Sequence, residues 1–431
     1  MHRLSKLILF LNKIFGILLV LSFFLSTEIE ASSASFALKP SLVPQPVNLF
    51  QQTDLVVYDE RPLLTPSRTL KVSRILKSRI SQETILSLPV GEYISESAKL
   101  VKASNKDIIL AYLKTNTQTG TTIELIRYKG DDFKSIINQA SLTPARLGVP
   151  NFSSFTFTID SLDNVYLAVT GPINAITVAA VPAANLNTIL AIQQIPGQVY
   201  ILSYSALQMK VRKPFRVDLS YVLNHYGGWE DVEVTTLSLL DSGAKATTYI
   251  DGGYPSYYGL SPYFEINSLT GEAIVTVCTP TGMQFKYRDA AGNWGALTPF
   301  PAGIANANFV RFAFQPQGVL HGIVAFPFTS QGSQVDYVIL AQNGATLVTQ
   351  FPVRKLSVNE VFSGGEIAKY PLEAGYTLPF IMQTADVTQL TNVYTYLEFW
   401  PCATIKPLHA AAGIPNKEII GNFAYTPYSK P

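Results

Sequence analysis

The sequence predicts an all-β protein, specifically a β-propeller of about seven four-stranded blades, with six or eight blades as alternatives. Short runs rich in Val, Ile, Thr, Tyr and Phe alternate apolar with polar residues, and Gly and Pro separate them throughout. Apolar residues make up 47% of the chain and charged residues only 14%, which favours a large core. The third observation is an internal repeat, and it decides between a propeller and other all-β folds.

The repeat consists of a polar turn followed by an alternating apolar strand. It occurs at Asp107, Asn164, Gly271 and Gly318, with spacings of 57, 107 and 47 residues. Because the middle spacing is about twice the others, a further unit is expected near Lys213–Trp229. Units of roughly 45 to 55 residues with four strands have the length of propeller blades.

A second turn follows in three of these units, with its glycine at Gly130, Gly292 or Gly344. The distances from the first turn are 23, 21 and 26 residues, a regularity that unrelated hairpins would not keep. A single blade cannot bury both of its faces, so such units are expected to stack around an axis.

The N-terminal residues have the pattern of an export signal. Basic residues, Lys6 and Lys13 among them, flank the apolar run Ile14–Leu25, and small residues follow. This pattern predicts a cleaved signal peptide, with an uncleaved anchor as the alternative. We therefore expect an exported protein (secreted, periplasmic or on the cell surface) with no membrane span in the mature chain. The predicted segments are 1–34 signal peptide, 35–46 linker, 47–405 propeller and 406–431 tail or closing segment.

Two further expectations concern the ends of the ring and a basic stretch near its start. Val47–Asp59 and Asn392–Trp400 are the predicted partners that close the ring. In Ser67–Leu86 the apolar residues are partly spaced three and four apart, which indicates either a short helix or a basic linker.

Several segments resemble blades of the sialidase-like (Asp-box) propeller superfamily, among them "FTIDSLDNVYLAV", "FAFQPQGVLHGIV" and "FKYRDAAGNWGAL". In that family's turn an Asp caps backbone amides, a Gly adopts a left-handed conformation and a Trp packs on the blade. The resemblance assigns these structural parts to Asp289, Gly292 and Trp294. The family has a Thr before the Trp, where this chain has Asn293, so the resemblance concerns fold more than activity.

Sialidase chemistry would require an arginine cluster for the substrate carboxylate, a nucleophilic Tyr and an acidic Asp. Arg146, Arg216, Arg288 and Arg311 lie in different units and are the candidates for such a cluster. The family's Phe-Arg-Ile-Pro signature is absent, and we predict no catalytic residue. His225, His321 and His409 lack the spacing of metal ligands, so no metal or cofactor is predicted.

Two glycine-rich loops, Leu223–Glu233 and Asp251–Leu260, are the candidate binding region. Their aromatic residues would offer rigid contact area to a glycan or a protein, or would only cover blade edges. These candidate ligand-binding residues are Tyr226, Trp229, Tyr254, Tyr257 and Tyr258.

Charge and cysteine content limit the remaining function classes. With 32 Lys plus Arg against 30 Asp plus Glu, nothing favours nucleic acid as a partner. Cys278 and Cys402 either pair as a disulfide or remain two separate buried thiols. The sequence as a whole favours an exported, non-catalytic recognition module; a sialidase-like glycoside hydrolase and a surface scaffold protein are the alternatives.

Overall fold

The computed structural model describes most of the chain after the first fifty residues, all of it within the compact unit 39–431. The described residues are 52–61, 67–76, 79–171, 175–197, 200–241, 245–255, 262–267, 269–279, 282–314, 319–327, 329, 332–341, 344–367, 378–386, 391–399, 407–410, 414–416 and 419–429.

The described strands form seven antiparallel sheets, numbered here in chain order. The first three sheets contain, in spatial order, β29 (Ile419–Ser429), β1 (Gln52–Arg61), β2 (Thr69–Leu76) and β3 (Arg79–Ser87); β4 (Glu92–Lys102), β5 (Ile108–Asn116), β6 (Gly120–Tyr128) and β7 (Ile136–Leu142); and β8 (Ser154–Ile159), β9 (Asn164–Thr170), β10 (Ile176–Pro182) and β11 (Ala191–Ile195). A short 3-10 helix, η1 (Pro144–Leu147), joins the second sheet to the third.

The remaining four sheets follow the same meander. They contain β12 (Ile201–Lys213), β13 (Arg216–His225), β14 (Trp229–Ser238) and β15 (Lys245–Pro255); β16 (Tyr263–Ile266), β17 (Ala273–Thr279), β18 (Gly282–Arg288) and β19 (Thr298–Pro299); β20 (Phe309–Phe314), β21 (Leu320–Ala325), β22 (Ser333–Ala341) and β23 (Thr346–Leu356); and β24 (Glu360–Ile367), β25 (Leu378–Asp386), β26 (Thr391–Phe399) and β27 (Pro407–Ala410), with β28 (Ile414–Asn416) also paired to β26.

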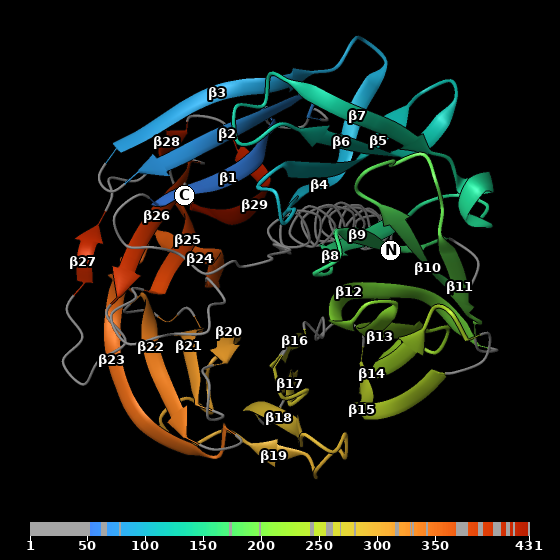
Figure 1. Ribbon diagram of the computed structural model, residues 1–431. Coiled ribbons are helices and arrows are strands. Elements are labelled where there is room, and N and C mark those ends of the chain that lie inside the picture. The colour runs from blue at the N-terminus through green and yellow to red at the C-terminus, as the bar shows by residue number, and fades with distance from the viewer. Residues whose placement is uncertain are drawn as a thin grey trace, which may run out of the picture. The chain divides into compact units, whose positions relative to one another are not determined.

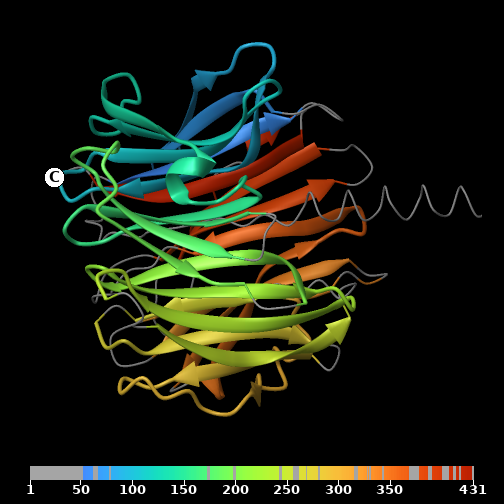
Figure 2. The same ribbon diagram turned by 90° about the vertical axis from the view of Figure 1, so that its right-hand side faces the viewer.

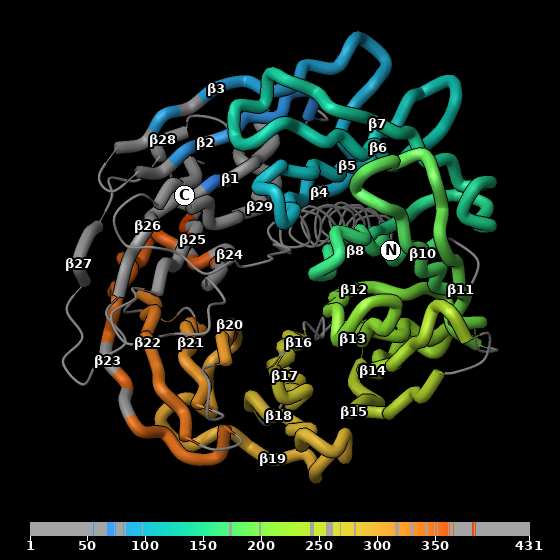
Figure 3. Tube along the Cα trace, in the orientation of Figure 1, coloured from blue at the N-terminus to red at the C-terminus, as the bar shows by residue number. Residues whose placement is uncertain are grey.

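These sheets follow one another around a ring in chain order (Figure 1), and the Cα trace passes from one to the next between β4 and β23 (Figure 3). The first strand of each sheet contacts the first strand of the next, from β4 through β8, β12, β16 and β20 to β24. Strands run back and forth across the ring, so successive turns lie alternately on its two faces (Figure 2). The predicted all-β propeller is confirmed, with seven blades among the described residues.

The core lies between neighbouring sheets and not within any one of them. Each apolar cluster combines buried residues from two consecutive sheets; Phe155 and Val101, for instance, share one cluster of the second and third sheets. Similar clusters join the first to the second, the third to the fourth, the fourth to the fifth and the fifth to the sixth sheet. Since each fully buried Leu, Ile or Phe contributes roughly 1.5–3 kcal/mol, sheet-to-sheet burial is the main stabilising term. All residues of β9 are buried, which explains its nearly continuous apolar sequence.

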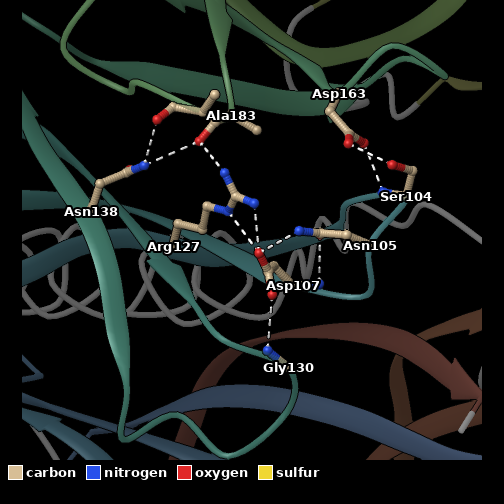
Figure 4. Close-up of polar contacts among 9 residues, drawn as sticks. Ser104, Asn105, Asp107, Arg127, Gly130, Asn138, Asp163 and Ala183 are labelled. Atoms are coloured by element: carbon tan, nitrogen blue, oxygen red, sulfur yellow. Dashed lines mark hydrogen bonds and ion pairs between the residues drawn. The ribbon is translucent and has the colours of Figure 1, made fainter.

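Polar links at the turns reinforce this packing, as Figure 4 shows for the second and third sheets. Arg127 donates to the Asp107 carboxylate, with Nη2 2.6 Å from Oδ2, and to the carbonyl oxygen of Ala183 at 2.9 Å. Asp163 accepts from the backbone nitrogen of Ser104 at 2.7 Å. The turn that begins a repeat unit is therefore bonded to the neighbouring unit.

The repeat positions fall where the pattern predicted. Asp107 stands directly before β5, Asn164 begins β9 and Gly271 is two positions before β17; these are the second strands of their sheets. The unit expected near Lys213–Trp229 contains β13, the second strand of the fourth sheet. Gly318 is outside the described residues, two positions before β21, another second strand. The second turns, at Gly130, Gly292 and Gly344, join third to fourth strands.

Two expectations were wrong. Ser67–Leu86 contains no helix: β2 and β3 pair as an antiparallel hairpin, in which Leu70 and Val72 are buried at strand spacing. The ring is not closed by Asn392–Trp400, because residues 391–399 form β26 within the seventh sheet. Instead β29 pairs with β1, for example Val56 with Tyr425.

Candidate binding surface on the fourth sheet

The exposed turn between β13 and β14 carries two of the predicted binding residues. Tyr226 is 69% exposed and Trp229 is 50% exposed, both high values for aromatic side chains. Gly228 has φ of 78° and Gly227 lies under the indole, where a Cβ would come within 2.5 Å of the Trp229 ring. The two glycines therefore allow the tight turn and place the Trp229 ring over it.

Asp231 is held beside this turn by contacts from two strands. Its Oδ2 lies 2.8 Å from Nε2 of His225, and its Oδ1 accepts from the backbone nitrogen of Gly253 at 2.7 Å. A Cβ on Gly252 would fall 1.8 Å from Asp231 Oδ1. Glycine at position 252 therefore makes room for the carboxylate, which is part of the reason for the Gly-Gly pair in the loop. The His225 and Trp229 ring centroids are 6.3 Å apart, so the hydrogen-bonded His225–Asp231 pair adjoins the indole.

Tyr254, on β15, is the cross-strand partner of Glu230 on β14. Its hydroxyl donates to Asp251 Oδ2 at 2.9 Å, and its ring packs on the apolar cluster between the fourth and fifth sheets. Burial, and next the hydrogen bond to Asp251, raise the pKa of Tyr254 to about 12. Tyr254 is therefore anchored and uncharged at neutral pH, and presents only part of its ring.

Two tyrosines that the sequence did not single out extend this surface. Tyr200 is 75% exposed, and its carbonyl oxygen accepts from the backbone nitrogen of Tyr226 at 3.1 Å. Tyr249 is 52% exposed on β15, and burial, followed by the charges of Asp231 and Asp251, raises its pKa. No local motif marks either residue: Tyr200 precedes a strand, and Tyr249 joins the group through strand pairing.

We call Tyr200, Tyr226, Trp229, Tyr249 and Tyr254 the aromatic surface of the fourth sheet. Three of the five predicted residues, Tyr226, Trp229 and Tyr254, thus lie at the same end of the fourth sheet. Tyr257 and Tyr258 are outside the described residues.

The predicted structural turn lies on the fifth sheet, between β18 and β19. Asp289 Oδ1 accepts from the backbone nitrogen of Asn293 at 2.8 Å, a bond that holds the pKa of Asp289 below its ordinary value. Gly292 has φ of 98°. Trp294 is half-buried against the fourth-to-fifth sheet cluster, with its ring centroid 5.3 Å from Cζ of Arg288. In this arrangement Trp294 is a packing residue.

The four candidate arginines lie on four different elements. Arg146 lies on η1 and Arg216 begins β13. Arg288 is buried at the end of β18 and donates to Asp218 at 2.8 Å. Arg311, on β20, is buried with its guanidinium over the Phe309 ring.

Charged groups on the innermost strands link neighbouring sheets. Lys99 Nζ donates to the carbonyl oxygen of Phe155 at 2.6 Å, joining β4 to β8. Lys210 pairs with Glu265 at 3.1 Å, joining β12 to β16. Buried cations of this kind require such partners, and here the partners come from the next blade.

Other predictions from the sequence concern a metal site, a membrane span and the two cysteines. Among the residues described, no group of three or more His, Cys, Asp or Glu is placed to hold a metal ion. No helix in that part of the chain has the length and apolarity for a membrane span. Cys278 is half-buried, and burial raises the pKa of its thiol. Cys402 is outside the described residues, so both alternatives for the two cysteines, a disulfide or two separate thiols, stay predictions, as does the signal peptide.

Several solved structures resemble this chain over much of its length. Hadza microbial sialidase Hz136 is 8% identical, with 80% of this chain and 91% of that one covered and a TM-score of 0.42. A subtype N11 neuraminidase-like protein of A/flat-faced bat/Peru is 9% identical, with 69% and 84% covered and a TM-score of 0.40. Cobalt-substituted Synechocystis ACO is 11% identical, with 91% and 98% covered and a TM-score of 0.46.

The fold of the described residues is thus a seven-bladed β-propeller. No protein-family model matches the sequence, and no curated protein does. At identities and TM-scores this low the likeness assigns no activity or residue, and the propeller assignment rests on the seven sheets themselves.

Proposed function

We propose that the protein is an exported, non-catalytic recognition module that binds a glycan through the aromatic surface of the fourth sheet. The observation that carries this proposal is the grouping of Tyr200, Tyr226 and Trp229, each at least half exposed, beside the fixed carboxylate of Asp231. Apolar ring faces suit the C–H faces of a sugar, and carboxylates accept hydrogen bonds from its hydroxyls. Large exposed rings gathered on one surface are typical of binding sites.

The non-catalytic part of the proposal is supported by the positions of the charged side chains. Lys99, Lys210 and Arg288 are engaged between sheets, and the guanidinium of Arg311 is buried over the Phe309 ring. The export part is supported by the N-terminal sequence pattern. A protein ligand is the alternative occupant of the same surface.

The test is a glycan-array screen of the chain from Ser35, run beside a hydrolysis assay on fluorogenic glycosides. We expect binding without turnover. Trp229→Ala should reduce array binding about tenfold or more, since removal of a central aromatic anchor costs at least about 2 kcal/mol. The matched control is Leu269→Ala, which removes a 74% exposed apolar side chain on the fifth sheet.

Turnover by the wild-type chain would contradict the proposal and favour the hydrolase. Equal losses in Trp229→Ala and Leu269→Ala would place the glycan elsewhere. A silent array together with capture of a protein ligand that depends on Trp229 would keep the surface but replace the glycan with a protein.

A further inference from the structure

A second polar site lies on the sixth sheet, away from the aromatic surface. It is a cleft of about 310 Å³ beside the β21–β22 turn and the outer strand β23. Its lining includes Phe326, Ser333, Gln334, Asp336, Gln350 and Lys355. Small-molecule sites range from roughly 300 to 1,000 Å³, so this cleft has room for one small ligand.

Asp336 lies in the cleft wall as a buried carboxylate with only neutral partners. It is 1% exposed, and its two oxygens accept one bond each, from Gln334 Nε2 at 2.6 Å and Gln350 Nε2 at 2.7 Å. Each carboxylate oxygen has more than one lone pair, so acceptor capacity remains on both. Buried carboxylates are normally paired with a cation, and among the described residues Asp336 has no such partner. Its oxygens can therefore accept further hydrogen bonds from a ligand.

Ser333 supplies an independent indication of a ligand. Ser333 is 7% exposed, and its hydroxyl oxygen is buried without a hydrogen-bond partner among the described residues. An unsatisfied buried hydroxyl costs about 1–3 kcal/mol, which a bound hydroxyl or water would recover. Among the described residues, the cleft therefore combines a carboxylate that can accept further hydrogen bonds with a hydroxyl that has no partner.

The edge of this cleft is fixed by backbone contacts. Gly332 has φ of 96°, and a Cβ there would lie 2.1 Å from the carbonyl oxygen of Leu356. The backbone nitrogens of Thr329 and Gly332 each donate to the other residue's carbonyl oxygen at 2.9 Å. The site is thus preformed, which lowers the entropic cost of binding.

The charges of the lining select a neutral ligand. The exposed ammonium of Lys355 opposes a cationic ligand, while the buried carboxylate of Asp336 opposes an anion. A ligand with several hydroxyls can donate to Asp336 and accept from Lys355 and Ser333 at once. The half-buried ring of Phe326 offers an apolar face to C–H groups.

We propose that this cleft binds one neutral sugar unit, with Asp336 as the main hydrogen-bond acceptor. The proposal does not depend on the aromatic surface of the fourth sheet. The two sites can therefore be tested separately, because Trp229 belongs only to the fourth-sheet surface and Asp336 only to the sixth-sheet cleft.

The experiment is saturation-transfer NMR with methyl glycosides of mannose, galactose and N-acetylglucosamine, titrated into the chain from Ser35. We expect weak binding to the wild type and to Trp229→Ala. Asp336→Asn keeps the shape of the side chain but replaces one acceptor oxygen with a donor group, and it should weaken binding at least about tenfold. Lys355→Ala, an exposed and structurally mild change, should weaken binding several-fold.

The thermal midpoint of each variant shows whether it is folded. If Asp336→Asn does not fold, Lys355→Ala and Ser333→Ala decide the question in its place. Absence of glycoside binding to the wild type, or binding that is unchanged in folded Asp336 and Lys355 variants, would overturn the proposal. Binding lost only in Trp229→Ala would also overturn it, and would assign the sugar to the fourth sheet.

Discussion

Lowering the pH is expected to destabilise the protein through His321, on β21. The residue is 2% exposed, and its Nδ1 is hydrogen-bonded to the hydroxyl of Tyr337 on the neighbouring strand. Burial lowers the pKa of this imidazole from 6.5 to about 4. The folded chain thus resists protonation at a position where the unfolded chain accepts a proton readily.

The direction of this pH effect on stability follows from proton linkage. Well above pH 6.5 His321 is neutral in both states and contributes no pH dependence. As the pH falls from 6.5 towards 4, the unfolded chain binds the proton first, so the free energy of unfolding decreases. With these two pKa values the loss between about pH 7.5 and about pH 4.5 is about 2.5 kcal/mol.

The assay is urea denaturation, followed by tryptophan fluorescence at several pH values, of the wild type and of His321→Gln. Glutamine retains a hydrogen-bonding group for Tyr337 but has no proton to titrate in this range. All other titrating groups are shared, so the difference between the two pH profiles isolates His321. We expect that difference to grow below pH 6.5. Parallel profiles over the whole range would refute the reasoning.

Two other predictions concern links that hold the ring together. Arg127→Met should lower the free energy of unfolding by about 3 kcal/mol, because the buried Asp107 carboxylate loses its cation. Adding Asp107→Asn should restore much of the lost stability, and equal stability of the single and double variants would contradict this explanation. Ending the chain before Ile419 should remove β29 and leave β1 as an open edge, which promotes aggregation in size-exclusion chromatography, whereas ending it after Ser429 should not.

Local signals accounted for most of the fold. Asp107 and Asn164 could be placed before second strands because turn chemistry and two-residue alternation are properties of a few adjacent residues. Ser67–Leu86 was misread because a short apolar run fits both helical and strand spacing, and the deciding contact of Leu70 comes from another sheet. The partner of β1 was misassigned because no local feature of a strand records which distant strand it pairs with.

In the candidate sites too, features within a few positions of sequence could be predicted, and contacts that depend on strand pairing could not. Tyr226, Trp229 and Tyr254 were found because aromatic residues among glycines stand out within a few positions of sequence. The contact of Asp231 with His225 depends on the register of β13 and β14, and its bond to Gly253 depends on a bulge between β14 and β15 beside Glu230. The sixth-sheet cleft was missed entirely, since Gln350 reaches Asp336 only through the register of β22 and β23, which also contains a bulge.

The pairing of β29 with β1 has a consequence for how the protein is made. The first sheet needs residues near both ends of a chain of 431, so it stays incomplete until the last strand has been synthesised. Such a distant contact forms slowly, because a very long loop must close first. Until β29 pairs, the edge of β1 stays open, and an unpaired edge strand promotes aggregation. A holding chaperone would protect the incomplete first sheet during that delay.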